Sequence, residues 1–359
     1  MDNSRTGPRR ERIEWIDAAR GVALFSMFVA HTAPSGGPAG VLNLTEHLTA
    51  ALFAALIGVS ARLEAGRMGL GPALLRSLWR GAVLVALTLL NAQFGAGVVD
   101  ILGFLAVVTL LAALLAGLPW MVRAGLAALL LAVAPLLQST WGAGRLALSL
   151  TQSGLDPALA SGIQDLAAGP YYRLPSLLLW ALVGSLVLDS LTRGRGGKAS
   201  RPRALVVCAA GTVVAAVVMV WIRWERGSFL VPYTGEQAEV VFNTALVVAV
   251  VAGCAAVVPL LPLGLTRLLA VPGSMTLTLY VAHTAFLGWV ARHPGPWQVS
   301  GGYDDSWLVL GTLMLGAVVV ALLWRTGVRR APWSAGPIEG VIRAAENLVG
   351  GSRRPSGGQ

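Results

Sequence analysis

The sequence predicts an all-α fold: a polytopic integral membrane helix bundle of about ten transmembrane helices with both termini in the cytoplasm. Hydrophobic residues make up 55% of the 359 residues and charged residues only 12%, where soluble domains usually carry about a quarter of charged residues. The mean hydropathy is +0.70. Many apolar runs are long enough to cross a bilayer, and the basic residues are distributed unevenly between alternate connections.

A membrane-spanning helix needs about 20 mostly apolar residues. Runs of this kind are predicted at 15–33, 46–62, 73–92, 97–117, 119–138, 173–192, 203–222, 238–258, 273–291 and 305–324. Residues 139–172 form the longest outer connection, and the segment DPALASGIQDLAAGPYY within it predicts a short helix over the outer mouth of the bundle.

The distribution of Lys and Arg supports this topology, because cytoplasmic connections carry an excess of basic residues. With a cytoplasmic N-terminus, most of the 27 basic residues fall on the inner side, and Arg20 lies within the first helix. The basic residues of the outer connections are Arg145, Arg173, Arg223, Arg226 and Arg292. A cleaved signal peptide is an alternative for the start, since basic residues precede the run GVALFSMFVA, but Asp17 and Arg20 interrupt its hydrophobic part.

The chain is predicted to have three parts. Residues 1–11 are expected to form a disordered cytoplasmic N-terminus, residues 12–330 the transmembrane domain, and residues 331–359 a cytoplasmic C-terminal tail with a short amphipathic segment. Cys208 and Cys254 lie in apolar runs, so we expect small buried hydrophobic residues and neither a disulfide framework nor a metal site. The net charge of +10 reflects orientation in a membrane, and no nucleic-acid partner is expected.

The first predicted helix carries three ionisable residues that a hydrocarbon span does not favour. Arg20 and His31 are eleven residues apart, which is three helical turns plus about 20°, so both side chains leave one face roughly 16 Å apart along the axis. Asp17 falls on that face too. Ionisable groups in a bilayer normally face a bundle interior or a wet cavity, which makes the stripe a functional-site hypothesis. Arg20 could pair with Asp17 as a structural salt bridge, or attract a phosphate group.

Further polar residues are predicted at the level of His31, near the outer ends of the following helices: Glu46, His47, Asn91, Gln93 and Asp100. A carboxylate beside a histidine fixes the tautomer and supports a general base. We therefore predict His31 and Asp100 as catalytic residues.

A second polar patch lies in GSMTLTLYVAHTAF, residues 273–286, where Tyr280, His283 and Thr284 share one helical face. These residues either line a substrate tunnel or form hydrogen bonds between helices. No P-loop, GxGxxG, HExxH or CxxC pattern occurs in the sequence, so an ATP-driven pump or a thiol-metal enzyme is not predicted.

The opening RIEWIDAARGVALFSMFVAH, with its Arg20-x10-His31 spacing, resembles the first helix of the transmembrane acyltransferase superfamily. This superfamily joins acyltransferase family three, the heparan-alpha-glucosaminide N-acetyltransferase-like family and the YeiB-like family. The segments LFAALIGVSARL (52–63), RSLWRGAVLVALTLLNAQFGAGVVDILGFLAV (76–107), GSMTLTLYVAHTAF and GPIEGVIR (336–343) resemble further motifs in the same order. Histidines stand at 31 and 283, where the YeiB-like pattern more often has Asn and a Gln-type residue, so the subfamily stays open.

The resemblance implies that residues 12–330 form an acyltransferase-like domain. It would move an acyl group, acetyl above all, from cytoplasmic acyl-CoA (acetyl-CoA) to a hydroxyl or amine of an extracytoplasmic glycan or lipid-linked acceptor. His31 would act as general base or acyl carrier, Arg20, Asn91, Tyr280 and His283 would bind substrate or donor, and no metal is implied.

The expected location is the cytoplasmic (inner) membrane, in contact with membrane lipids, and a homo-oligomer is compatible with the sequence. Two other functions remain open. A secondary transporter or lipid flippase would use the Asp17, Arg20 and His31 stripe as a polar pathway, and a membrane scaffold would have no catalytic residues.

Overall fold

A computed structural model describes residues 13–193, 198–297 and 305–350, and all regular secondary structure in these ranges is helical. The α-helices are α1 (Glu14–Thr32), α2 (Leu44–Met68), α3 (Leu70–Ala92), α4 (Leu102–Ala116), α5 (Trp120–Trp141), α6 (Arg145–Gln152), α7 (Pro157–Ala168), α8 (Leu174–Thr192), α9 (Arg201–Arg226), α10 (Gln237–Val257), α11 (Leu263–Gly273), α12 (Thr276–Arg292), α13 (Trp307–Gly327) and α14 (Pro337–Gly350). Short 3-10 helices lie between some of them, and one of these, η5 (Trp333–Ala335), precedes α14.

Each of the ten predicted spans contains a helix, but the described ranges do not give ten full crossings. Seven helices there are long and apolar enough to cross a membrane, and an eighth crossing results if α11 and α12 are taken together. Those two helices meet at an angle of 71°, so the predicted straight span 273–291 is the second half of a bent pair. α4 has only 15 residues, and α1, with Asp17 and Arg20, is not among the seven. The chain is therefore a multi-pass membrane protein.

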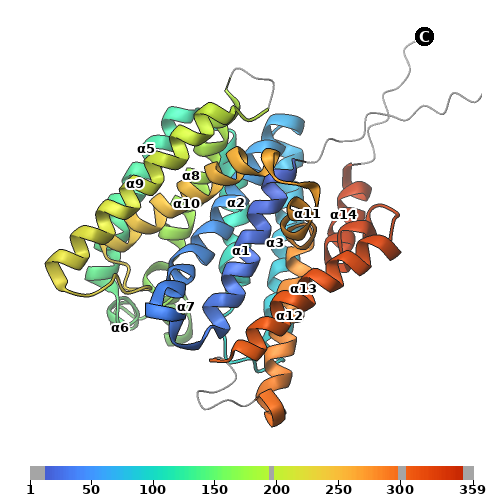
Figure 1. The fold of residues 1–359 in the computed structure, drawn as a ribbon. Helices are drawn as coiled ribbons and strands as arrows, with labels where there is room; N and C mark the ends of the chain where they lie inside the picture. The colour runs from blue at the N-terminus through green and yellow to red at the C-terminus, as the bar shows by residue number, and fades with distance from the viewer. Residues whose placement is uncertain (1–12, 194–197, 298–304, 351–359) are drawn as a thin grey trace, which may run out of the picture.

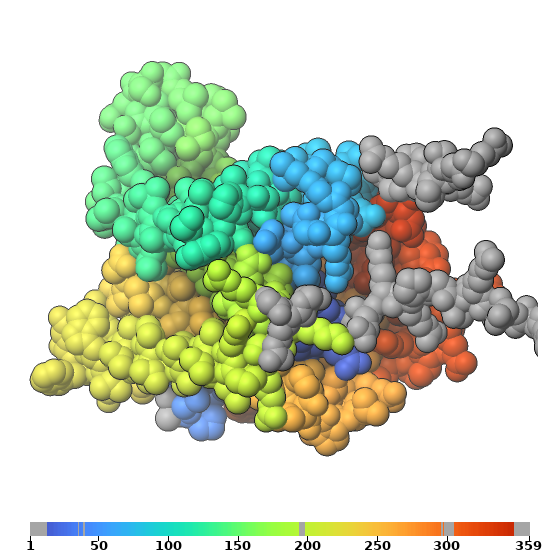
Figure 2. All heavy atoms as spheres, turned by 90° about the horizontal axis from the view of Figure 1, so that it is seen from above, coloured from blue at the N-terminus to red at the C-terminus, as the bar shows by residue number. Residues whose placement is uncertain are grey.

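Helices α1 and α2 lie in the middle of the bundle (Figure 1). α2 packs against α8, α1 packs against α11, and α9 lies outside α10. The predicted short helix in residues 139–172 is confirmed as α7, whose first turn is capped by the Asp156 carboxylate. Figure 2 shows the green α6–α7 segment at one edge of the molecule and the red α14 at the other.

Two helix crossings depend on glycine, which allows the close approach that membrane bundles use. A Cβ atom at Gly58 in α2 would collide with the carbonyl oxygen of Ala181 in α8, and one at Gly184 in α8 would collide with that of Ala55. The α1–α11 crossing is equally tight at Gly21. These crossings hold the backbones of the central helices in direct contact.

An ion-pair network joins α2, α5 and α8 at one end of the bundle, with Arg123 buried and with Arg62 and Asp189 half-buried. Asp189 accepts hydrogen bonds from Arg62, at 2.9 and 3.1 Å, and from Arg123. Arg123 is only 1% exposed and also donates to Ser185 Oγ, at 2.7 Å. A buried guanidinium needs such partners, because an unpaired charge there is costly.

The predicted disorder of residues 1–11 lies outside the described residues, as does the end of the predicted C-terminal tail, residues 351–359. Within the predicted amphipathic tail, residues 337–350 form α14, which contacts α3 and α12. The division into a domain at 12–330 and a tail at 331–359 stays a prediction.

Candidate functional site

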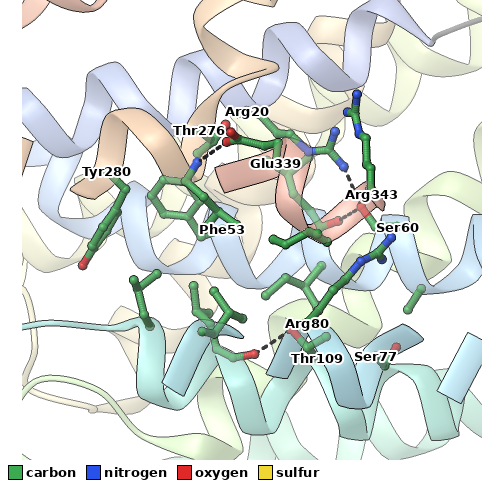
Figure 3. Close-up of a pocket in the computed structure, with 18 of the residues that line it drawn as sticks. Arg20, Phe53, Ser60, Ser77, Arg80, Thr109, Thr276, Tyr280, Glu339 and Arg343 are labelled. Atoms are coloured by element: carbon green, nitrogen blue, oxygen red, sulfur yellow. Dashed lines mark hydrogen bonds between the residues drawn. The ribbon is translucent and has the colours of Figure 1, made fainter. Parts of the chain in front are cut away.

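A cavity of about 270 Å³ lies between α1, α2, α3, α4, α12 and α14. Most of its wall is apolar, and its polar side chains gather into groups (Figure 3). The polar and charged lining residues are Arg20, Ser60, Glu64, Ser77, Arg80, Thr109, Ser274, Thr276, Tyr280, Glu339, Arg343 and Glu346. Tyr280 lies at the opposite end from Arg343 and Ser60 (Figure 3). The site therefore has a guanidinium-rich end and a tyrosine end with an apolar passage between them.

Arg20 reaches the guanidinium-rich end from the middle of α1. One of its nitrogens lies 3.0 Å from Asp17 Oδ1 and another donates to Ser60 Oγ at 2.8 Å. The Asp17 side chain is 6% exposed and that of Arg20 is 33% exposed. The predicted salt bridge between Asp17 and Arg20 is therefore present, and Arg20 still lines the cavity.

At the other end of the cavity, Tyr280 of α12 donates its hydroxyl proton to Asp100 Oδ1 at 2.7 Å. The backbone N–H of Leu102 donates to the same oxygen at 3.2 Å. Asp100 Oδ2 is buried and has no hydrogen-bond partner among the described residues. Buried carboxylate oxygens are normally satisfied, so an orphaned acceptor here is typical of a site that receives a ligand or serves a reaction.

Next to Tyr280, two histidines from distant helices meet. His31 Nδ1 lies 3.3 Å from His283 Nε2, and the rings stack with their centroids 5.5 Å apart. His283 Nδ1 contacts the backbone carbonyl of Tyr280, which can only accept a hydrogen bond. In a neutral pair, His283 Nδ1 therefore carries the proton, its Nε2 accepts from His31 Nδ1, and His31 Nε2 is left with a free lone pair. His283 is 1% exposed, whereas His31 is half-buried.

Asn91 of α3 contacts Thr284, the residue that follows His283 in α12. Its Oδ1 accepts a hydrogen bond from Thr284 Oγ1 at 3.1 Å, and its buried Nδ2 has no partner among the described residues. Both Asn91 and Thr284 were predicted as polar residues near His31 or His283. The structure thus brings an unused amide donor close to the histidine pair.

Glu46 and His47 belong to a separate cluster at the start of α2. His47 hydrogen-bonds Asn243 Oδ1 at 3.0 Å and the Leu230 carbonyl at 3.2 Å. Glu46 lines a small cavity of about 20 Å³ together with Tyr172 and other residues. Burial raises the pKa of the Tyr172 phenol, and the nearby carboxylates of Asp100 and Glu46 act in the same direction. No residue lines both this small cavity and the larger one.

The predicted site residues fall into two places. Within the described ranges, Asp100 hydrogen-bonds the Tyr280 hydroxyl, the Tyr280 carbonyl contacts His283, and His283 contacts His31. The catalytic role of Asp100 beside His31 stays a prediction. Arg20 and Tyr280 line the cavity. His31, His283, Asn91 and Asp100 are not among its lining residues.

Sequence reasoning missed the acidic residues of the guanidinium-rich end, Glu64, Glu339 and Glu346, which approach Arg80 or α12 from distant parts of the chain. The GPIEGVIR motif was the available signal for two of the lining residues, Glu339 and Arg343. No group of His, Cys, Asp and Glu that could hold a metal ion occurs within the described ranges.

A comparison with protein families finds a match over residues 12–158, which run from just before α1 into α7. The matching family model is described as the catalytic part of heparan-alpha-glucosaminide N-acetyltransferase. No curated protein matches the chain. The matched part contains Arg20, His31, Asn91 and Asp100, whereas Tyr280 and His283 follow it. The resemblance to this acyltransferase family is thereby confirmed over residues 12–158, where the chain is similar to the catalytic part of heparan-alpha-glucosaminide N-acetyltransferase.

Proposed function

We propose that this protein is a membrane-embedded acyltransferase that moves an acyl group, acetyl above all, from cytoplasmic acyl-CoA to a hydroxyl or amine of an extracytoplasmic glycan or lipid-linked acceptor. The observation that carries the proposal is the cavity itself. Its guanidinium-rich end and its Tyr280 end are separated by apolar walls, and the histidine pair adjoins Tyr280. The family match over residues 12–158 supports an acetyltransferase.

The donor would enter at the guanidinium-rich end. Guanidinium groups bind phosphate oxygens through charge-assisted hydrogen bonds, and Arg20, Arg80 and Arg343 all line that end. The apolar passage suits a pantetheine arm that leads the thioester toward Tyr280. The excess of basic residues in the predicted inner connections supports a cytoplasmic entrance, and with it an inner-membrane location.

His31 would act as the general base. Its Nε2 takes the proton from the acceptor hydroxyl or amine as that oxygen or nitrogen attacks the thioester carbonyl carbon. The new C–O or C–N bond forms, the C–S bond breaks, and the electron pair leaves with the CoA sulfur, which then takes up a proton. If His31 carries the acyl group instead, Nε2 attacks the thioester carbonyl, the C–S bond breaks and CoA leaves as the thiolate. The acceptor then attacks the acyl-imidazolium, the C–N bond breaks with its electron pair returning to Nε2, and the acceptor proton passes to the CoA thiolate.

The remaining site residues would bind and orient the substrates. His283 fixes the proton of His31 on Nδ1, because its own Nδ1 donates to the Tyr280 carbonyl. The orphaned atoms Asp100 Oδ2 and Asn91 Nδ2 are an acceptor and a donor that a polar substrate group could satisfy.

The test uses the purified protein in nanodiscs with radiolabelled acetyl-CoA and a panel of amino sugars, sugar alcohols and lipid-linked glycans. We expect label transfer to an acceptor, and a decrease of about 10² to 10⁴ in kcat for His31→Ala, the range of general acid–base catalysis. His293→Ala is the matched control, because this exposed histidine hydrogen-bonds only within its own helix end. Equal turnover in His31→Ala and His293→Ala would remove His31 from the mechanism.

A secondary transporter or lipid flippase is the second candidate. The bent α11–α12 pair favours it, since broken helices often form transport sites. Uptake of substrate into proteoliposomes without acyl-CoA would support transport, whereas acetylated product that requires acetyl-CoA would support the enzyme.

A further inference from the structure

The C-terminal helix α14 covers the guanidinium-rich end of the cavity. Glu339, Ile342, Arg343 and Glu346 of α14 all line the cavity, and Figure 3 shows Glu339 and Arg343 beside Arg20 and Ser60. α14 contacts α3, α12 and the preceding η5. It lies beyond the predicted spans and beyond the residues matched by the family model. α14 is therefore a separate element over one end of the site.

The first attachment of α14 lies at the start of α12. Glu339 Oε1 accepts hydrogen bonds from the backbone N–H groups of Leu277 and Thr278, at 2.8 and 3.1 Å, and Oε2 accepts from Thr278 Oγ1 at 2.6 Å. The carboxylate thus satisfies free N–H groups at a helix N-terminus. Gly336 makes this contact feasible, because its φ is +119° and a Cβ atom there would collide with Glu339.

The second attachment is an ion pair with Arg80 of α3. Arg80 Nε lies 2.6 Å from Glu346 Oε1, and Arg80 Nη2 lies 2.6 Å from Glu64 Oε1. Two carboxylates therefore share one guanidinium. The Glu64 Oε2 atom is buried and has no hydrogen-bond partner within the described ranges. Like charges held this close repel each other, so one of the two carboxylates is more easily exchanged for another anion.

We propose that Arg80 is an anion-binding subsite for a phosphate-bearing ligand, and that the Glu346 carboxylate occupies it in the free protein, so that α14 is a lid which the ligand displaces. A phosphate oxygen takes the place of Glu346 on Arg80, because Glu346 belongs to a helix with few contacts whereas Glu64 belongs to α2 in the bundle. The Glu339 attachment stays closed and acts as the pivot. The GPIEGVIR motif then has a physical meaning: Gly336 and Glu339 form the pivot and Arg343 lines the cavity.

The ligand is defined by its anionic group and not by the rest of the molecule. Under the proposed function, on which this identification of the ligand rests, the group is a phosphate of CoA. Inorganic pyrophosphate presents the same chemistry without the nucleoside or the thiol, and adenosine presents the nucleoside without phosphate. The three probes therefore separate the subsite from the choice of donor.

The test measures how fast a thiol on α14 reacts with a water-soluble maleimide, in the full chain with Cys208→Ser and Cys254→Ser. Ile342→Cys places the thiol on the cavity side, where Ile342 is 7% exposed, and Val341→Cys places it on the adjacent outward position, which is 48% exposed. We expect Ile342→Cys to react slowly in the free protein. Glu346→Gln should increase the maleimide reaction rate of the Ile342→Cys thiol about fivefold or more, as expected for a shift of a two-state lid toward its open form. The reaction rate of the Val341→Cys thiol should stay constant.

Pyrophosphate and CoA should each accelerate the reaction of the Ile342→Cys thiol with maleimide, and adenosine should not. Glu346→Gln should bind pyrophosphate more tightly than the unchanged chain. A rate in Glu346→Gln equal to that of the parent would overturn the lid. Acceleration in Glu346→Gln without any effect of pyrophosphate or CoA would overturn the anion subsite. Acceleration by pyrophosphate but not by CoA would support the subsite and contradict CoA as the donor. A faster maleimide reaction of the Val341→Cys thiol when Glu346→Gln is also present would show that α14 has unfolded, which overturns the hinged lid.

Discussion

His31 Nδ1 lies 3.3 Å from His283 Nε2, although the two residues are separated by 252 positions in the sequence. His31 comes from α1 and His283 from α12. The Tyr280 carbonyl accepts a hydrogen bond from His283 Nδ1 and so keeps the proton on that nitrogen. A chain of fixed donors and acceptors of this kind gives each ring one tautomer. The unshared nitrogen of the pair is then always Nε2 of His31.

Replacement of His283 should separate positioning from structure. In His283→Leu, His31 Nδ1 loses its acceptor and both tautomers become populated, so we expect kcat for acetyl transfer to decrease about tenfold or more while KM for acetyl-CoA changes little. His283→Gln supplies an amide oxygen that can accept from His31 Nδ1, and should recover most of kcat. Steady-state kinetics of the unchanged protein, His283→Leu and His283→Gln measure these effects. A kcat of His283→Gln as low as that of His283→Leu would contradict the positioning role.

The α2–α8 crossing should not tolerate a side chain at Gly58. The added methyl group of Gly58→Ala meets the Ala181 carbonyl, so the two backbones must separate, at a cost of about 3 kcal/mol. Gly125→Ala in α5 is the control, because no atom lies within 4 Å of its Cβ position, and it should raise stability by up to about 1 kcal/mol. Unfolding by denaturant in detergent measures both, and an unchanged midpoint for Gly58→Ala would show that the crossing is looser than described.

Asp189→Asn should strongly destabilise the bundle. It removes the carboxylate that pairs Arg62 and Arg123 and leaves the buried Arg123 guanidinium without a counter-charge, which typically costs about 3–5 kcal/mol. Glu236→Gln removes the partner of Arg226, whose side chain is 45% exposed where that of Arg123 is 1% exposed, and should leave the unfolding midpoint unchanged. Similar midpoints for the two variants would mean that the Asp189 network contributes no more than a surface ion pair.

Glu339 should make stability depend on pH. Burial raises the pKa of this carboxyl above its ordinary value, although its hydrogen bonds to Thr278 and Leu277 act in the opposite direction. The folded state therefore holds the proton more tightly than the unfolded state, and stability decreases as pH rises from the ordinary carboxyl pKa through the raised one.

Glu339→Gln stays neutral at every pH. Its free energy of unfolding relative to that of the unchanged protein should therefore increase as pH rises from the ordinary carboxyl pKa through the raised one. Unfolding midpoints of both proteins between about pH 4 and about pH 8 measure the difference. A difference that stays constant, or shrinks as pH rises, would contradict a raised pKa.

The sequence predicts the helices well because hydrophobic runs depend on local composition. All ten predicted runs contain a helix, and α7 lies in the segment DPALASGIQDLAAGPYY, for which a short helix was predicted. The bend between α11 and α12 was missed, although Pro272 and Gly273 precede it directly. The predicted span began at Gly273, which left α11 unassigned. α11 contacts α1 closely at Gly21, and this contact joins two segments that are far apart in the sequence, so hydropathy could not predict it.

The site was predicted in part for the same reason. Helical spacing within α1 identified Asp17, Arg20 and His31, and spacing within α12 identified Tyr280 and His283. Which of these residues meet depends on the rotation and depth of each helix in the bundle. Asp100 was predicted as the neighbour of His31 from its depth alone, whereas in the structure it hydrogen-bonds Tyr280. The acidic partners of Arg80 could not be predicted from spacing, since Glu64 and Glu346 come from opposite ends of the chain.

The carboxylate that caps α12 lies 62 residues after Leu277. During synthesis, the ribosome therefore makes α12 long before it makes Glu339, and membrane segments insert in the order of translation. Until α14 emerges, the first N–H groups of α12 face the interior without this acceptor. α14 thus completes the wall of the cavity, so that a chain interrupted before α14 would present an open and incompletely capped site.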